Sequence, residues 1–351
     1  MAFVTDSFRF FGYRVPCHSH SITFPSGPSR QLSSLRRDMR RSARQAFAQK
    51  SWSNLRTQFN AYFMFCLHFH LVPLPADLDT ICLYTQFLSR SFVSPQAIRN
   101  YVNGVKFLHI ITGHAYDFSN NRILQLVLKG IEKGLSHMPV RATPISPHIL
   151  KAVARAISLH SPEDVTCLCA SVLLFLLMAR AGNVFYHMEH GKPRGLSRSH
   201  VVFSRHAILV TFTHTKTITF GSRVLQIPLL AVPDSLLCPV AIFRRMVQLT
   251  PAAPSQPLFV TFSGGQLAPL SKISFLAHFR SLLVRAGVSS PSAFSCHSFR
   301  RGGASWAFRV GVPGEIIQIY GDWASDCYKR YLDISLDTRF VLARAVRDSL
   351  L

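Results

Sequence analysis

Apolar residues between positions 50 and 135 recur every three or four residues, which is the spacing of one face of an α-helix. The first such stripe follows a candidate N-cap at Ser53 and comprises Leu55, Phe59, Tyr62, Phe63 and Cys66. Similar stripes cover residues 78–88 and 123–131, and another runs from Ser94-Pro95 to Gly113, which are typical start and stop residues. Together the stripes predict a small all-helical domain over residues 35–135.

Proline residues separate this domain from the rest of the chain, and residues 136–147 are predicted to be a linker. Ser146-Pro147 begins another helix. The segment Val165–Ala179 is apolar on every side, so we expect a helix buried inside a second domain, with Ser161-Pro162 as its start. Further helices are predicted from Cys238-Pro239 to Leu249 and over Ile273–Val284.

Between residues 200 and 229 the hydrophobic period becomes two, which is the period of a β-strand. Val201–Phe203, Ile208–Thr213 and Val224–Leu229 are predicted to form three strands of a small antiparallel sheet, and Leu258–Phe262 another short strand. The predicted fold class is therefore mostly α with a small antiparallel β-sheet (α+β). The second domain covers residues 148–351.

The first 34 residues show no periodicity and contain clusters of Ser, Pro and His, so residues 1–34 are expected to form a disordered arm. Residues 36–50 are rich in arginine and fit a basic helix or a flexible arm that contacts DNA, and an ordinary solvated basic face fits them equally well. Met1–Arg14 lacks the apolar centre of a signal peptide, and the apolar run that ends at Ala179 is too short to span a bilayer. The pattern predicts no association with a membrane.

The charge balance changes the picture of the partner. Lys plus Arg number 39 and Asp plus Glu number 16, so the formal net charge is +23. Such an excess, interleaved with apolar positions along the chain, indicates a polyanionic partner, most simply nucleic acid. Hydrophobic residues make up 48% of the chain, which supports a packed core and argues against a disordered basic tail. None of the eight cysteines forms a Cys-x-x-Cys pair, so we predict no zinc site and a reducing compartment.

Candidate chemistry concentrates between Cys296 and Leu332. His297 and Arg300 are three residues apart at a predicted helix start, where an imidazole and a guanidinium on one face suit an oxyanion. Trp323 and two tyrosines, Tyr328 and Tyr331, follow. Either tyrosine has the hydroxyl of a nucleophile. Taken alone, the His-x-x-Arg pair fits a solvated helix end equally well.

Two further cations lie far upstream. Arg180 directly follows the buried apolar helix, where a charge is costly unless it has an anionic partner. Lys216 lies in the turn or strand end of His214-Thr215-Lys216-Thr217. Considered locally, Arg180 fits a structural role and Lys216 fits an ordinary hairpin lysine.

These features coincide in order and spacing over more than 150 residues. Arg180, Lys216, His297-x-x-Arg300 and Gly321-Asp322-Trp323 before Tyr331 together resemble the tyrosine recombinase (phage integrase) family. The match is closest to its eukaryotic mobile-element branch of the DIRS and Crypton type, in which "His-Ser-Phe-Arg-Arg-Gly-Gly-Ala" is familiar. The resemblance covers Arg36 to the end of the chain. It implies a helical, SAM-like core-binding domain and an integrase-type catalytic domain that clamp duplex DNA.

The resemblance also implies roles for individual residues. Arg180 and Arg300 become the two arginines on the scissile phosphate, Lys216 the general acid, and Tyr331 the nucleophile. His297 assists the arginines, and Trp323 fills a position held by His or Trp. Positive side chains can neutralise the charge that develops on the phosphoryl oxygens, so the family needs no metal or cofactor.

Two positions depart from the family pattern. Asn183 stands where many relatives carry an acid after the first arginine, and we assign it no role. The spacing from Trp323 to Tyr331 is one residue shorter than in many bacterial relatives, so Tyr328 stays a rival nucleophile. We favour Tyr331 because the Arg-Tyr-Leu ending matches the mobile-element branch.

The expected function is site-specific cutting and rejoining of double-stranded DNA through a 3′-phosphotyrosine, in the integration or excision of a mobile element. The alternatives are a catalytically decayed or domesticated DNA-binding protein and, less favoured, a type IB topoisomerase. By analogy we expect a homotetramer on paired DNA sites, formed by docking of a segment near 335–351, and a nuclear location, or cytoplasmic if the source is not eukaryotic. The residues assigned to DNA contact are Arg99, Lys106, Arg141 and Arg301.

Overall fold

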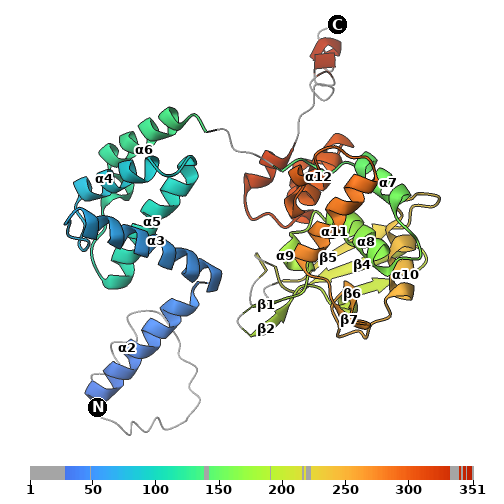
Figure 1. The fold of residues 1–351 in the computed structure, drawn as a ribbon, viewed down its shortest axis with the longest axis horizontal. Coiled ribbons are helices and arrows are strands. Elements are labelled where there is room, and N and C mark those ends of the chain that lie inside the picture. Colours follow the sequence, from blue (N-terminus) through green and yellow to red (C-terminus); the bar gives the residue numbers. More distant parts are fainter. Residues whose placement is uncertain are drawn as a thin grey trace. The chain divides into compact units, whose positions relative to one another are not determined.

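The structure is a computed structural model. It describes residues 28–47, 49–137, 142–189, 191–215, 217–218 and 223–332, and near the C-terminus 340, 343–344 and 346–349. The chain divides into two compact units, with the boundary between Leu135 and Ser136 (Figure 1). In the described part, no helix is both long and apolar enough to cross a membrane.

The first unit is helical throughout its described length. Its elements are α2 (Pro28–Gln45), α3 (Gln49–His68), α4 (Leu78–Ser89), α5 (Pro95–Thr112), the 3₁₀ turn η1 (Phe118–Asn120) and α6 (Arg122–Leu135). The predicted apolar stripes form one core, in which the Tyr62 and Tyr84 rings meet edge to face with centroids 5.1 Å apart. Gly113 ends α5 with a φ of 81°, a left-handed conformation that glycine adopts without strain.

Helix α2 corrects the prediction of a disordered arm. The helix starts at Pro28, so the last part of the segment 1–34 is helical, and residues 1–27 lie outside the described residues. Proline at the first helical turn loses no hydrogen bond and has its φ already set, which explains the start. For residues 36–45, the basic-helix interpretation is therefore the right one.

The second unit mixes helices with short strands. Its helices are α7 (Pro147–Ala156), α8 (Pro162–Leu176), α9 (Ala181–Val184), α10 (Pro239–Leu249), α11 (Lys272–Arg285), α12 (Cys296–Arg309) and α13 (Gly314–Tyr320). Its 3₁₀ turns are η2 (Arg198–His200), η3 (Pro291–Ala293) and η4 (Asp326–Tyr331). Its strands are β1 (His187–Glu189), β2 (Lys192–Arg194), β3 (Val201–Phe203), β4 (Ala207–Phe212), β5 (Leu225–Leu230), β6 (Val260–Ser263) and β7 (Gln266–Pro269).

The predicted three-stranded sheet is confirmed. β4 lies between β3 and β5, both antiparallel to it, and Val210 is opposite Val201 on one side and Ile227 on the other. Along β4, Ile208, Val210 and Phe212 are buried, as the period of two requires. The hairpins β1–β2 and β6–β7 add two small sheets; β1, β2 and β7 were not predicted because such short segments carry no readable period.

Helix α8 is the centre of the second unit, and α7, α10, α11 and α12 contact it (Figure 1). From Asp164 to Phe175 every residue of α8 is buried. Burying one side chain of the size of Leu or Phe contributes about 1.5–3 kcal/mol, so this helix supplies much of the core. The prediction of a buried helix is confirmed, and the Ser161 side chain caps it by accepting a hydrogen bond from the Asp164 N–H at 3.1 Å.

Two glycines of α12 let neighbouring backbone approach this helix closely, because they have no side chain. A Cβ on Gly303 would lie 2.1 Å from the carbonyl oxygen of Phe175 in α8, and one on Gly302 would lie 1.9 Å from the carbonyl oxygen of Ile145. The Ile145 N–H also donates to the Ser298 carbonyl at 3.0 Å. Gly303 therefore lets α12 lie against the end of α8, and Gly302 lets the segment before α7 lie against α12.

Candidate active site

The turn Gly321-Asp322-Trp323, which follows α13, builds one wall of the site. The Trp323 indole folds back over Gly321, where a Cβ would lie 1.8 Å from the ring. Asp322 has a φ of 57°, a left-handed conformation in which Asp and Asn are enriched among residues other than glycine. Trp323 and Asp322 are both 5% exposed, so the aromatic ring and the carboxylate both point into the protein.

Arg300 comes from the first turn of α12 and is almost completely buried. Its Nη1 donates to the Gly321 carbonyl at 2.7 Å and to the Met178 carbonyl, and its guanidinium carbon lies 3.7 Å from the centre of the Trp323 ring. Its Nη2 is buried and has no hydrogen-bond partner among the described residues. Burial, and after it the positive charge of Arg180, lower the pKa of Arg300 to about 9. A bound oxyanion would raise this pKa again, because it stabilises the charged guanidinium. The buried charge therefore favours anion binding here.

Arg180 directly follows the turn at the end of α8 and lies beside the same motif. Its Nη1 donates to the Asp322 carbonyl at 3.4 Å and lies 3.9 Å from the Asp322 carboxylate. Its side chain is 25% exposed, so it keeps access to solvent while Arg300 does not. Arg180 and Arg300 thus lie at the same motif, and in the described structure Asp322 is the one carboxylate ion-paired there. The excess positive charge is available for an anion.

The Asp322 carboxylate also accepts hydrogen bonds from side chains of the segment after β4. Thr215 Oγ1 donates to it at 2.6 Å, and Thr217 Oγ1 and the Arg223 guanidinium donate to it as well. Asn183 lines the same small space between Arg300 and the β4–β5 strands. Sequence reasoning gave Asp322 no role, and Arg223 carried no local signal at all because its partner is 99 positions away.

His297 and Arg300 lie on the first turn of α12, as their spacing predicts. The Ser295 hydroxyl accepts from the His297 N–H at 3.2 Å and caps this helix. The imidazole is exposed, and its pKa is lowered by desolvation from the surrounding protein and then by the charges of Arg300, Lys272 and Arg180. These effects favour the neutral form of the ring when no anion is bound.

The two tyrosines occupy different environments on η4. In a 3₁₀ turn, residues three apart are eclipsed, so Tyr328 and Tyr331 share a face, with ring centroids 6.2 and 5.7 Å from that of Trp323. Tyr328 is only 3% exposed and packs against Gly314, whereas Tyr331 is half-buried and Ser305 Oγ donates to its carbonyl. Tyr331 also opposes the lowering of the Arg300 pKa, which makes it an electrostatic neighbour of that guanidinium.

The other predicted site residues are distributed as follows. Lys216 and Arg141 lie outside the described residues. Arg301, beside Arg300, donates from Nη1 to the Ala142 carbonyl at 3.0 Å. This bond holds the segment before α7 against α12. In the first unit, Arg99 and Lys106 line a polar depression of about 160 Å³, but Arg99 pairs there with Glu132 at 2.7 Å, so part of its charge is already compensated.

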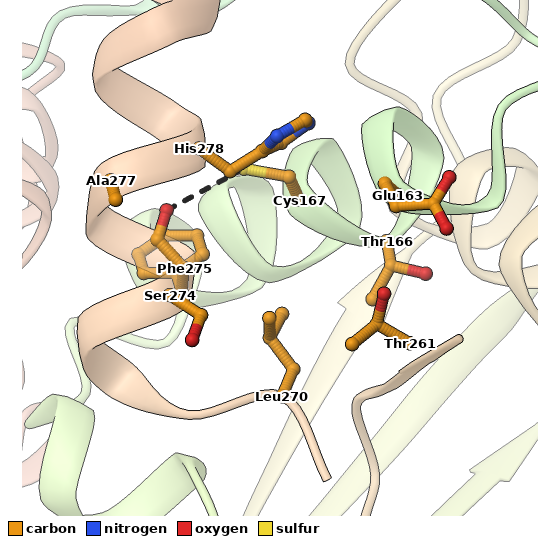
Figure 2. Close-up of a pocket in the computed structure, with 9 residues that line it drawn as sticks. All are labelled: Glu163, Thr166, Cys167, Thr261, Leu270, Ser274, Phe275, Ala277 and His278. Carbon is orange, nitrogen blue, oxygen red and sulfur yellow. Dashed lines mark hydrogen bonds between the residues drawn. The ribbon is translucent and has the colours of Figure 1, made fainter. Parts of the chain in front are cut away.

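A larger pocket of about 360 Å³ lies elsewhere in the second unit, between α8, α11 and β6 (Figure 2). Its walls include Leu270, Phe275 and Cys167, whose thiol points to the Phe275 carbonyl at 4.0 Å. Complete burial raises the pKa of the Cys167 thiol, so it is no nucleophile. This pocket contains none of the residues predicted to carry chemistry.

No family model matches the chain, and no curated protein matches it. Solved structures do match. A lambda integrase dimer bound to a COC′ core site has 14% identity and a TM-score of 0.53, over 94% of this chain and 85% of that chain. The Tn1549 transposon integrase in complex with circular intermediate DNA has 12% identity and a TM-score of 0.52, over 78% and 86%. The XerH site-specific recombinase bound to palindromic difH substrate has 13% identity and a TM-score of 0.52, over 82% and 79%.

These structural neighbours are tyrosine recombinases and integrases. At such identities the likeness establishes a shared fold, a helical domain followed by an α+β domain, and nothing finer. The predicted fold class is confirmed.

Proposed function

We propose that this protein is a tyrosine-type DNA strand transferase that cuts and rejoins duplex DNA through a 3′-phosphotyrosine. The observation that carries the proposal is the Arg300 environment: a buried guanidinium whose Nη2 has no partner among the described residues, beside Arg180 and near Tyr331. A buried charge without its counter-charge is costly, so this arrangement fits a protein whose working state includes an anion. The net charge of +23 fits a DNA phosphate as that anion.

In the proposed reaction, the Tyr331 hydroxyl attacks the scissile phosphorus. A bond forms between the tyrosine oxygen and phosphorus, and the bond from phosphorus to the 5′ oxygen breaks. The tyrosine proton is lost to solvent or a neighbouring base, and Lys216 gives a proton to the leaving 5′ oxygen. Arg180 and Arg300 stabilise the charge that develops on the phosphoryl oxygens, where fixed donors in a desolvated site are most effective.

Rejoining is the same reaction reversed. A 5′ hydroxyl from another DNA end attacks the phosphotyrosine, restores the phosphodiester and releases Tyr331. Because the covalent link keeps the bond energy, strand exchange needs no nucleotide triphosphate.

The finer assignment within this proposal is a recombinase of a eukaryotic mobile element of the DIRS or Crypton type. The motif from His297 to Ala304 and the ending Arg330-Tyr331-Leu332 support it. Such a protein acts in the nucleus, as a homotetramer on two paired DNA sites. We propose that apolar residues in and beside the segment near 335–351 support this docking between subunits. Phe340 is described and is 53% exposed, and Ile334, Leu336, Val341 and Ala345 lie outside the described residues.

The test is covalent capture on nicked suicide duplexes drawn from the DNA that flanks the coding sequence. The nick lets the short strand with the 5′ hydroxyl diffuse away, so the protein stays attached. Labelling the 3′ and 5′ sides of the cut strand separately should give a denaturation-resistant adduct that carries only the DNA on the 5′ side of the cut, joined through its 3′ phosphate.

Each other outcome has a definite meaning. Specific binding of the flanking DNA with no adduct from folded protein would indicate the decayed DNA-binding alternative. Relaxation of unrelated plasmids without strand exchange would indicate a type IB topoisomerase. An adduct through a 5′ phosphate would contradict the proposed polarity.

A further inference from the structure

We infer that Asp322 is a positioning residue that holds Thr215 and Thr217 close to Arg180 and Arg300. These two threonines flank Lys216 in the chain. The contacts of Asp322 stand by themselves, but their consequence for catalysis rests on the proposed function. Asp322 lies between Gly321, which binds Arg300, and Trp323, which covers it, so its own placement is fixed by the site.

The contacts converge on one buried carboxylate. Oδ2 accepts from the hydroxyls of Thr215 and Thr217 and lies 3.9 Å from Arg180, while Oδ1 accepts from Arg223. Thr217 and Arg223 belong to a segment more than 90 positions earlier in the chain than Asp322. Hydrogen bonds to a charged partner are roughly twice as strong as neutral ones, so this carboxylate binds the segment after β4 strongly to the turn after α13.

These side-chain hydrogen bonds continue into backbone hydrogen bonds. Thr215 Oγ1, which donates to Asp322, itself accepts from the N–H groups of Thr217 at 3.1 Å and Ile218 at 3.0 Å, and the Thr215 N–H donates to the Ile218 carbonyl at 3.1 Å. Asp322 therefore orients the hydroxyl around which this turn is folded. In sequence the turn encloses Lys216, the proposed general acid, so removing the carboxylate should loosen the chain on both sides of it.

Charge balance explains why the residue is an acid. Asn183 lines the same space but carries no charge, and among the described residues Asp322 is the only acid that forms an ion pair with Arg180 or Arg223. An amide at position 322 would keep the backbone, because Asn tolerates the left-handed conformation as well as Asp does. The amide would, however, lack the negative charge that pairs with Arg180 and Arg223. Asp322→Asn is thus a variant of the same shape that isolates the carboxylate.

The first measurement needs no DNA. Amide hydrogen exchange in the free protein should be at least about tenfold faster at Thr217 and Ile218 in Asp322→Asn, while the amides of β4 keep their protection. Glu315→Gln is the matched control, because it removes one charge from an exposed position on α13, close to Asp322 in sequence, and it should leave both amides unchanged. Unchanged exchange at Thr217 and Ile218 in Asp322→Asn would overturn the inference.

If Asp322→Asn does not fold, Arg223→Ala replaces it. Arg223 is 48% exposed, so its truncation leaves the core intact while it removes one partner of the carboxylate. Exchange at Thr217 and Ile218 should then rise by a smaller factor of about three. Arg223→Ala without any increase would count against the inference in the same way.

The second measurement tests the link to proton transfer. A suicide duplex with sulfur in place of the bridging 5′ oxygen leaves as a thiolate, so the step needs no proton on the leaving group. Asp322→Asn should slow adduct formation on the oxygen substrate by about 10²-fold and on the sulfur substrate by less than about fivefold. An equal loss on both substrates would mean that Asp322 acts only through Arg180 and Arg300, and would overturn the role toward Lys216.

The two proposals fail differently. If the wild-type protein forms no adduct on either substrate, the proposed function is wrong, while the hydrogen-exchange result still decides whether Asp322 fastens the turn. If the wild type forms adducts and the exchange is unchanged in the variants, the proposed function stands and the inference about Asp322 is wrong.

Discussion

The Arg300 guanidinium lies 3.7 Å from the centre of the Trp323 ring, inside the protein. An aromatic face attracts a cation, and a desolvated pair of this kind contributes about 2 kcal/mol or more. The indole also covers one side of the guanidinium, so Arg300 is held by a ring and two carbonyl oxygens, and its Nη2 stays without a partner in the described structure. Trp323 therefore holds Arg300 in place through the face of its indole ring.

Replacing Trp323 with Phe should keep the protein folded and lower the rate of adduct formation by about tenfold. Phenylalanine retains an aromatic face, but its attraction for a cation is weaker by about 1 kcal/mol. Trp323→Ala should cost about 3–5 kcal/mol of stability, because the ring is buried beside Tyr328 and Tyr331. Suicide-substrate kinetics and thermal unfolding measure the two effects, and a Trp323→Phe variant with unchanged kinetics would show that the ring contact is irrelevant to catalysis.

Arg300→Ala should reduce adduct formation by about 10²–10³-fold while DNA affinity changes only a few-fold. In the proposed reaction the guanidinium acts mainly on charge that develops in the transition state, and removing one such donor has effects of this size. Arg309→Ala is the matched control, since it removes the same charge from an exposed position on the same helix. Parallel gel-shift and adduct assays separate binding from cleavage; equal losses of both in Arg300→Ala would refute the assignment.

Tyr331→Phe should abolish the covalent adduct and leave DNA affinity nearly unchanged. The substitution removes a nucleophilic hydroxyl but no charge that holds the DNA backbone. Tyr328→Phe should retain cleavage with at most a modest loss, because Tyr328 is buried against Gly314 and Trp323 and serves packing. Denaturing gels with labelled suicide DNA compare the two variants. Survival of the adduct in Tyr331→Phe, with loss in Tyr328→Phe, would show that Tyr328 is the nucleophile.

His297 should make the free protein less stable in mild acid. Desolvation, followed by the charge of Arg300, lowers the pKa of its imidazole below the ordinary value. In the window just below that ordinary value, the unfolded chain binds a proton that the folded protein does not. Stability therefore rises with pH through this window and is lost as the pH falls. The melting temperature of the wild type should fall more than that of His297→Gln between pH 7.5 and 5.5, by a small margin because the ring is exposed. Parallel curves for the two proteins would contradict the prediction.

Gly303→Ala should destabilise the second unit by about 1–3 kcal/mol or more, because its Cβ would lie 2.1 Å from the Phe175 carbonyl oxygen in α8. Gly130→Ala, in the middle of α6, meets nothing within 4 Å and should stabilise by about 0.5–1 kcal/mol, since alanine loses less backbone entropy in a helix. Chemical denaturation measures both. A neutral Gly303→Ala would mean that α12 can move away from α8 at no cost.

By itself, the sequence determined the elements with a strong period or clear terminal residues. The stripe from Leu55 to Cys66, the buried run after Ser161-Pro162 and the alternation along Ile208–Phe212 each state which face is buried, and the structure has these elements. Apolar side chains have one favourable destination, so their spacing alone fixes the local conformation. The start of α2 at Pro28 was missed because residues 28–34 contain a single large apolar residue, Leu32, which is too few to show a period.

For the candidate site too, the sequence determined one part and the tertiary structure decided the other. Motif order along the chain identified Arg180, Arg300 and Trp323 as members of one set. Only the tertiary structure decided that Trp323 lies over Arg300, that Tyr328 is buried while Tyr331 is half-exposed, and that Asp322 collects Thr215, Thr217 and Arg223. Those contacts join residues up to 107 positions apart. A polar side chain has many potential partners of similar strength, and the packing of α12 against α8 selects among them, which no local pattern in the sequence records.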